Sequence, residues 1–308
     1  DEGAFASATR EMLASGDWLS TTLNGAPRFD KPIMIYWLQA LSVGAFGFHE
    51  WSVRLPSVLA AGLWCVLVGR FARERLPAGT AGIALVVAAT SIGVMIIGRA
   101  ATADALLNLL LTAACLDGYR YLADGDRTAL RRTYVWVAIG ILTKGPIAVL
   151  VPGAAIGLYG LTAGRWRELL RGALDPVGLL LLLAIALPWY VAALMIHGQA
   201  FIDGFILKHN VERAMTPLHG HRGFVGFQLA ATLLLLPWTP VLLGAAAGIR
   251  ADFRDELKRF LWIWFLFVLL LFTVVSTKLP HYVLYGATPL FLLIALRARS
   301  AETGVWHH

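Results

Sequence analysis

Uncharged apolar stretches of about 20 residues recur along almost the whole chain, and a helix of that length is what crossing a lipid bilayer requires. A short stretch at 33–48 predicts an interfacial helix, after a surface helix over 2–15. The predicted spans are 55–72, 79–97, 104–122, 133–143, 146–163, 177–197, 224–248, 260–277 and 281–296. The sequence therefore predicts an all-α polytopic membrane protein with about nine spans.

The composition excludes two other classes of protein. Hydrophobic residues make up 58% of the chain and charged residues 15%, and the mean hydropathy is +0.69, which is too apolar for a soluble domain. The net charge of +7 comes from basic residues that are distributed over short loops between spans. They do not form the clustered basic surface that binds nucleic acid, so we expect no nucleic-acid partner. Cys65 and Cys115 lie inside apolar stretches, where thiols act as small hydrophobic groups.

The basic residues also predict an orientation. More than half of the 26 Lys and Arg residues fall in loops on one side of the predicted membrane, and such loops are typical of the cytoplasmic face. The other side collects the remaining polar segments, at 1–53, 98–103, 144–145, 198–223 and 278–280. We therefore expect one periplasmic site built from several loops.

The predicted domain organisation follows from this topology. Residues 1–53 form a first periplasmic loop with interfacial helices, 54–299 form the transmembrane bundle with a periplasmic loop at 198–223, and 300–308 form a tail. The chain opens on acidic residues rather than on a basic stretch and an apolar one, so no signal peptide is expected at its start. We expect the chain to begin inside a longer protein.

Arg28, Asp30 and Lys31 stand between a turn and an uncharged stretch, where ionised groups are costly. One interpretation is an ion pair between neighbours at a turn, which contributes little to stability. The other is a carboxylate for base or metal chemistry beside cations that bind phosphate. Because Asp1 and Glu2 add two more acids to the same predicted face, we favour the functional interpretation.

Three further charged residues lie at the ends of predicted spans. Asp104 follows a short loop and either caps the next span or belongs to the site. Lys144 and Lys278 precede Gly-Pro and Leu-Pro pairs, and either reach the lipid headgroups or contribute to an anion site.

Histidines suggest metal chemistry only weakly. His209, His219 and His221 share the loop at 198–223, but their spacing matches no compact zinc motif such as H-E-x-x-H. A single histidine ligand with a distant carboxylate stays open. We interpret His281 and Tyr282, at the start of a span, as interfacial anchors.

Several strings, in order, resemble bacterial aminoarabinose transferases and related protein-mannosyltransferase-like enzymes of the GT-C glycosyltransferase fold. They include DEGAFASATREMLASGDW, LNGAPRFDKP, TADALL, TKGP, KHNVERA and STKLPHY, and the resemblance runs from Asp1 to about Leu296. It implies a GT-C helical bundle with a periplasmic loop and interfacial helices. It also implies a bacterial inner-membrane location, a periplasmic active site, and a chain that lacks a first helix, later spans and a soluble domain.

The resemblance also implies roles for individual residues. Asp1 is similar to the catalytic aspartate and Asp104 to a further acid in the loop before a span. Lys31 resembles the lysine that contacts the donor phosphate. We expect Arg10, Arg28 and Lys278 to add phosphate contacts.

The resemblance implies a divalent metal, zinc or magnesium or manganese, held by Asp30 and His209. Asp30 stands where the aminoarabinose enzymes often have glutamate, and Ala214 where they commonly have phenylalanine. The first departure widens the range of sugars that we expect.

The first hypothesis is an inverting glycosyltransferase that moves a sugar from a polyprenyl-phosphate donor to a lipid A-like lipid or another lipid or glycan acceptor, among membrane lipids. The alternative is a non-catalytic binder or transporter of the same donor, which would carry charges within spans on both faces. A metal-dependent membrane hydrolase ranks last, because its ligand set is incomplete.

Overall fold

The computed structural model describes residues 2–212, 232–275 and 279–303. Their regular secondary structure is helical apart from one short hairpin. The elements, in order, are α1 (Glu2–Ser15), β1 (Thr22–Leu23), β2 (Ala26–Pro27), α2 (Met34–Phe46), α3 (Glu50–Arg75), α4 (Thr80–Thr90), α5 (Ile92–Arg99), α6 (Asp104–Asp124), α7 (Arg127–Lys144), α8 (Ile147–Thr162), α9 (Trp166–Ala173), α10 (Pro176–His197), α11 (Gln199–Phe201), the π-helix η1 (Ile202–Glu212), α14 (Thr239–Ala247), α15 (Ile249–Asp252), α16 (Glu256–Val274), the 3-10 helix η3 (Pro280–Gly286) and α17 (Ala287–Thr303). The all-α fold expected from the sequence is confirmed.

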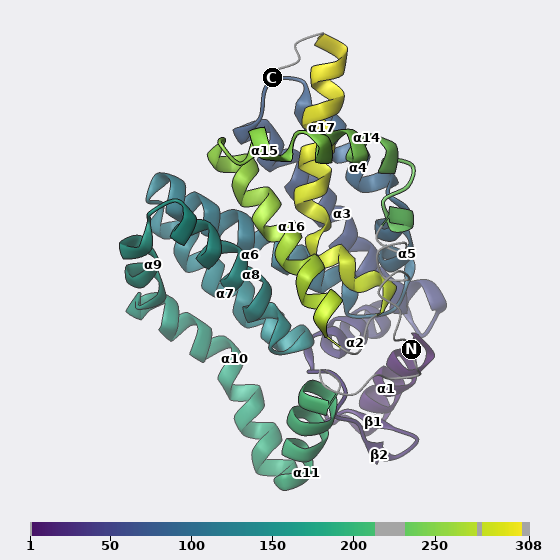
Figure 1. The fold of residues 1–308 in the computed structure, drawn as a ribbon. Coiled ribbons are helices and arrows are strands. Elements are labelled where there is room, and N and C mark those ends of the chain that lie inside the picture. Colours follow the sequence, from purple (N-terminus) through teal and green to yellow (C-terminus); the bar gives the residue numbers. More distant parts are fainter. Residues whose placement is uncertain (1, 213–231, 276–278, 304–308) are drawn as a thin grey trace.

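The long helices form a bundle with different structures at its two ends (Figure 1). The hairpin, α1, α2 and α11 gather at one end, which we call the site end, and α9 and α15 lie toward the other. Among the described residues, four helices are long and apolar enough to cross a membrane: α3, α10, α16 and the stretch Pro280–Ala301. The chain is a multi-pass membrane protein, while the full set of about nine spans stays a prediction.

The predicted span at 79–97 is not one straight helix. It breaks at Ser91 into α4 and α5, which are bent by 58° relative to each other. Ser91 has extended backbone (φ −65°, ψ 129°), and the amide of Ile92 donates instead to the carbonyl of Leu236, at 3.0 Å. The bend is stable because that distant carbonyl satisfies an amide which the break leaves without a helical partner.

Helix α2 is too short to cross the bilayer. Its 13 residues span about 20 Å, against a hydrocarbon core of about 30 Å. It ends at Gly47, whose φ of 81° suits glycine, and it packs against α1 and α3. These dimensions fit the interfacial helix that the sequence predicts.

A chain of polar groups ties three helices together inside the apolar core. The indole nitrogen of Trp64 in α3 donates to the hydroxyl of Thr288 in α17 at 2.7 Å, and that hydroxyl also pairs with Thr112 of α6 at 2.7 Å. All three side chains are buried. Because water cannot replace these bonds in the core, they favour one relative position of α3, α6 and α17.

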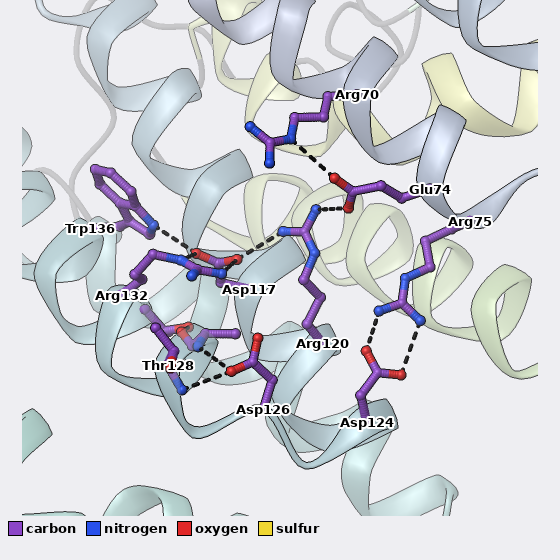
Figure 2. A network of polar contacts seen from close by, with 12 residues as sticks. Arg70, Glu74, Arg75, Asp117, Arg120, Asp124, Asp126, Thr128, Arg132 and Trp136 are labelled. Carbon is purple, nitrogen blue, oxygen red and sulfur yellow. Dashed lines mark hydrogen bonds and ion pairs between the residues drawn. The ribbon is translucent and has the colours of Figure 1, made fainter.

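A second polar network holds the end of the bundle opposite the site end (Figure 2). Asp117 of α6 is 4% exposed and accepts four hydrogen bonds, two from Arg132 at 2.9 Å, one from Trp136 at 2.9 Å and one from Arg120 at 2.8 Å. Arg120 continues to Glu74 of α3 at 2.6 Å. The buried carboxylate thus binds α6 to α7, and Arg120 binds it to α3.

Asp117→Asn is expected to lower the free energy of unfolding by about 1–3 kcal/mol, since the amide cannot accept all four bonds and loses their charge assistance. The measurement is thermal or denaturant unfolding of the purified protein in detergent. Asp124→Asn serves as control, because Asp124 pairs with Arg75 at the surface and its loss is expected to cost less than about 1 kcal/mol. Equal effects of the two substitutions would contradict the assigned role.

Candidate active site

Three elements that are distant in sequence bring charged and aromatic side chains together at the site end. Asp104 begins α6, Lys144 ends α7, and η3 supplies His281, Tyr282 and Tyr285. We call these five residues the Asp104 cluster. Lys144 is placed there because α7 ends at Gly145, whose φ of 74° favours glycine, and Pro146 precedes the next helix.

The Asp104 cluster centres on a buried ion pair. The ammonium of Lys144 lies 2.5 Å from Oδ1 of Asp104 and 2.7 Å from the hydroxyl of Tyr285. The same Oδ1 is 3.5 Å from Nε2 of His281, and Thr102 donates to Oδ2 at 3.1 Å. The Lys144 and Asp104 side chains are 11% and 12% exposed.

Aromatic rings complete the surroundings of Lys144. Its ammonium lies 5.0 Å from the ring centre of Tyr282 and 5.4 Å from that of Tyr285, distances at which a ring face attracts a cation. With little water present, these contacts hold Lys144 charged and in one position. The cluster therefore offers a fixed positive charge balanced by one carboxylate.

The hairpin positions the second group of charges. Asn24 and Gly25 both have positive φ (55° and 75°), as the tight turn between β1 and β2 needs. The carboxylate of Glu11 on α1 binds this turn through the amides of Asn24 and Gly25 and the hydroxyl of Thr22. The turn fixes where the chain leaves the hairpin toward Arg28.

Arg28 holds Asp30 in a two-pronged ion pair. Its Nε and Nη2 donate to the two carboxylate oxygens at 2.5 and 2.6 Å, and the guanidinium lies 5.2 Å from the ring centre of Phe5. The remaining nitrogen, Nη1, is buried and makes no hydrogen bond to any described residue. Lys31 donates to the carbonyl of Asp30 at 2.9 Å, and its charge acts electrostatically on His281 of the Asp104 cluster.

Glu2 anchors the start of α1 to α3 and to the loop before α6. Its Oε1 accepts from Arg54 of α3 at 2.5 Å and from the amide of Ala101 at 3.1 Å. The hydrogen bond from Arg54 holds the pKa of Glu2 below its ordinary value against the opposing effect of burial, and the hydrogen bond from Ala101 adds a smaller lowering. Ala101 lies in the loop that leads into Asp104, so α1 is held against that loop.

The structure brings some of the predicted site residues together and does not describe others. It brings Asp104 into a cluster with Lys144, and places Arg28, Asp30 and Lys31 near it at the site end. Arg10 is exposed on α1, 5.7 Å from the ring centre of Phe48. Three others cannot be placed: Asp1 and Lys278 lie outside the described residues, and so does the side chain of His209.

The described residues do not make up a metal centre. They contain no group of three or more His, Cys, Asp or Glu side chains placed to hold a metal ion, and both oxygens of Asp30 are bound by Arg28. The metal held by Asp30 and His209 stays a prediction.

Sequence reasoning missed three members of the Asp104 cluster. His281 and Tyr282 were expected to anchor the span at the interface, yet they lie beside Asp104 and Lys144, and Tyr285 was not singled out. The available signal was the position of His281 directly after a Lys-Leu-Pro segment on the predicted site face. Nothing in the local pattern of Tyr285 distinguishes it from an ordinary core tyrosine.

The chain has relatives of known fold and name. It is 31% identical over 307 residues to the undecaprenyl phosphate-alpha-4-amino-4-deoxy-L-arabinose arabinosyl transferase of Edwardsiella ictaluri, covering 96% of this chain and 54% of the relative. It is 32% identical to arabinosyl transferase 1 of that type from Sodalis glossinidius, covering 97% and 54%. The chain thus spans about half the length of these curated relatives.

The fold matches two crystal structures of ArnT from Cupriavidus metallidurans. The structure bound to undecaprenyl phosphate has a TM-score of 0.87 and 24% identity, over 97% of this chain and 55% of that one. The apo structure has a TM-score of 0.86 and 23% identity, over 99% and 56%. These values establish a shared fold.

A family model identifies the chain directly. The model described as dolichyl-phosphate-mannose-protein mannosyltransferase matches residues 30–191, which is more than half of the chain and includes Asp30, Lys31, Asp104 and Lys144. The resemblance inferred from the sequence is confirmed, and the chain belongs to this mannosyltransferase family.

Proposed function

We propose that the chain is the membrane-embedded part of an inverting glycosyltransferase, which moves a sugar from a polyprenyl-phosphate donor to a lipid A-like lipid or another acceptor. The observation that carries this proposal is the meeting of the charged segments around Lys31 and Asp104 at one end of the bundle. The opposite end holds the basic loops, so by the positive-inside rule the site end faces the periplasm of a bacterial inner membrane.

The proposed reaction needs one base. An acceptor hydroxyl or phosphate, oriented by Asp1, attacks the anomeric carbon, and the bond from that carbon to the oxygen of the donor phosphate breaks. A hydroxyl acceptor passes its proton to Asp1. Phosphate leaves without being protonated, so one carboxylate suffices where glycosidases use two. Attack opposite the leaving phosphate inverts the anomeric configuration.

Positive charge at the site end would stabilise the departing phosphate. Lys31 is the primary contact that we propose, with Arg10 and Lys278 as further contacts. Arg28 contributes its positive charge, while its Nε and Nη2 hold Asp30 beside Lys31. The charge of Lys144 is balanced by Asp104 within the Asp104 cluster, so the positive charge that attracts the phosphate comes from Lys31, Arg10 and Lys278.

The names of the relatives suggest the first donor to test, undecaprenyl phosphate carrying 4-amino-4-deoxy-L-arabinose. The experiment follows radiolabel from this donor to an acceptor lipid extract, using the full-length protein. Lys31→Ala is expected to lower kcat/KM by about 10- to 150-fold, since a charged hydrogen bond contributes about 1.5–3 kcal/mol.

Arg73→Ala is the matched control for Lys31→Ala. Arg73 is an exposed cation of α3 at the opposite end of the bundle, and its loss is expected to leave transfer unchanged. If donor sugars bind but no label reaches an acceptor in the wild-type protein, the proposal fails and the binder or transporter hypothesis replaces it.

A further inference from the structure

A large cavity lies away from the site end, between α6, α7, α8, α9 and α10. Its volume is about 670 Å³, within the range of about 300–1,000 Å³ typical of sites for small molecules. The walls are mainly aliphatic, with Val137 of α7, Ile156 of α8 and Leu179 of α10 among them. This cavity is distinct from the Asp104 cluster, because its lining residues on α7, Leu130 to Val137, lie about 10–21 Å along that helix from Lys144.

The hydroxyl groups of the cavity lining already have partners. The hydroxyl of Tyr121 donates to the carbonyl of Glu168 at 2.8 Å, and that of Tyr134 donates to the carbonyl of Gly172 at 2.7 Å. The hydroxyl of Thr133 donates within its own helix at 3.0 Å. The cavity walls therefore suit an apolar occupant better than a sugar or a nucleotide.

The flanking helices direct this cavity to the bilayer. Exposed leucines on α8 and α10 continue the apolar surface outward, with Leu161 62% exposed and Leu180 67% exposed. Gly153 and Gly157 keep the α8 side of the cavity wide, since a Cβ added at either would meet no atom within 4 Å. An acyl chain from the surrounding lipid fits the apolar lining of the cavity and can reach it across the apolar surface of α8 and α10.

Helix α9 closes the cavity with an amphipathic pattern. Trp166, Leu169, Leu170 and Ala173 line the cavity at helical spacing, whereas Arg167 and Arg171 are exposed. A short helix of this kind, with arginine on its polar side, is typical of the membrane interface.

The positive charge at this rim is only partly balanced. Arg127 and Arg171 are both close enough to the cavity residue Tyr121 to act on it electrostatically. Three acids lie nearby: Glu168 of α9 acts on the same tyrosine, and Asp126 and Asp175 accept hydrogen bonds from the first amides of α7 and α10. Asp175 also lies 3.7 Å from Arg131. An anionic headgroup therefore complements the rim better than a zwitterionic one.

We propose that this cavity binds an acyl chain of an anionic glycerophospholipid from the leaflet on the α9 side, with the lipid phosphate at Arg167 and Arg171. The basic rim favours this occupant over the tail of a polyprenyl phosphate, whose own phosphate would bind at the opposite end. The site is independent of the proposed transfer reaction.

The test titrates the delipidated full-length protein with phosphatidylglycerol or phosphatidylcholine and counts bound lipids by native mass spectrometry. Phosphatidylglycerol is expected to bind about 30-fold more tightly, as two arginines near a lipid surface imply. Gly157→Phe fills the cavity and is expected to weaken this binding at least about tenfold. The matched control Gly62→Phe adds the same ring at an open position on α3 and is expected to have no effect.

A second experiment tests the role of the two arginines. The double variant Arg167→Gln, Arg171→Gln is expected to reduce phosphatidylglycerol binding to the level of phosphatidylcholine binding. Its control is Arg73→Gln with Arg250→Gln, two exposed arginines on other helices. Should Gly157→Phe fail to fold, Gly153→Phe fills the same cavity.

Three results would overturn the proposal. The first is equal affinity of the wild-type protein for both lipids. The second is phosphatidylglycerol binding that is the same in the Gly157→Phe and Gly62→Phe proteins. The third is displacement of phosphatidylglycerol by polyprenyl phosphate at equal concentration, because the cavity would then hold the donor tail.

Discussion

Lys144→Met is expected to lower the free energy of unfolding by about 3–5 kcal/mol, one of the two largest effects that the structure implies. Methionine nearly preserves the volume of the lysine but leaves the Asp104 carboxylate charged, 12% exposed and without its 2.5 Å partner. His281 lies 3.5 Å from that carboxylate, but an imidazole is a cation only when it is protonated. The measurement is unfolding of the purified protein in detergent, followed by tryptophan fluorescence.

A double-mutant cycle separates the ion pair from simple packing. Asp104→Asn in the Lys144→Met protein removes the uncompensated charge, so we expect it to restore more than half of the lost stability. Arg70→Met is the control, because Arg70 is exposed and its pair with Glu74 contributes less than about 1 kcal/mol. Additive effects of the two substitutions at 104 and 144 would show that the pair does not stabilise the fold.

Asp1→Asn is expected to reduce transfer by about 10²–10⁴-fold, which is the usual contribution of a general base. Donor affinity and the melting temperature are expected to stay at the wild-type values, because the amide keeps the shape of the side chain. Rapid-quench measurement of label transfer, together with a separate donor-binding titration, distinguishes these quantities. A matched Asp203→Asn variant, at an exposed acid of η1, is expected to retain full activity.

Retained turnover in the Asp1→Asn protein would remove Asp1 from the role of base. The result would leave the family membership untouched, since that rests on the match over residues 30–191.

Much of the fold follows from local patterns. The apolar stretches locate most of the described long helices, and Gly145 with Pro146 correctly separates α7 from α8. The short, uncharged stretch at 33–48 corresponds to α2, Met34–Phe46. These features depend on helix length and on the residues that end a helix, both of which are visible in a short window of sequence.

The break at Ser91 could not be predicted in the same way. Thr90, Ser91 and Gly93 weaken a helix locally, and the hydroxyls of Thr90 and Ser91 bond back to the carbonyls of Val86 and Val87. The contact that stabilises the break is not visible locally, because the carbonyl of Leu236 lies 144 residues away along the chain from Ile92. Tertiary contacts of this kind override local preference.

The site was only partly predictable for a related reason. The sequence identified Asp104 and Lys144 as polar residues at span ends, but their pairing depends on how α6 and α7 pack, and His281 and Tyr285 join them only through η3. The charges near Asp30 were predicted as a group. An ion pair between the adjacent residues Asp30 and Lys31 was one interpretation of the sequence. In the structure, the guanidinium of Arg28 makes the two bonds to the carboxylate of Asp30, and Lys31 donates to the backbone carbonyl of Asp30.

The most direct test of the proposed function is a product balance on the purified full-length protein. The assay supplies labelled undecaprenyl phosphate-aminoarabinose and acceptor lipid, and measures both the glycosylated acceptor and the released undecaprenyl phosphate. The account predicts that the two products appear in equal amounts, with inverted anomeric configuration, and that neither appears with the Asp1→Asn protein. Donor that binds in a Lys31-dependent manner without release of undecaprenyl phosphate would contradict it.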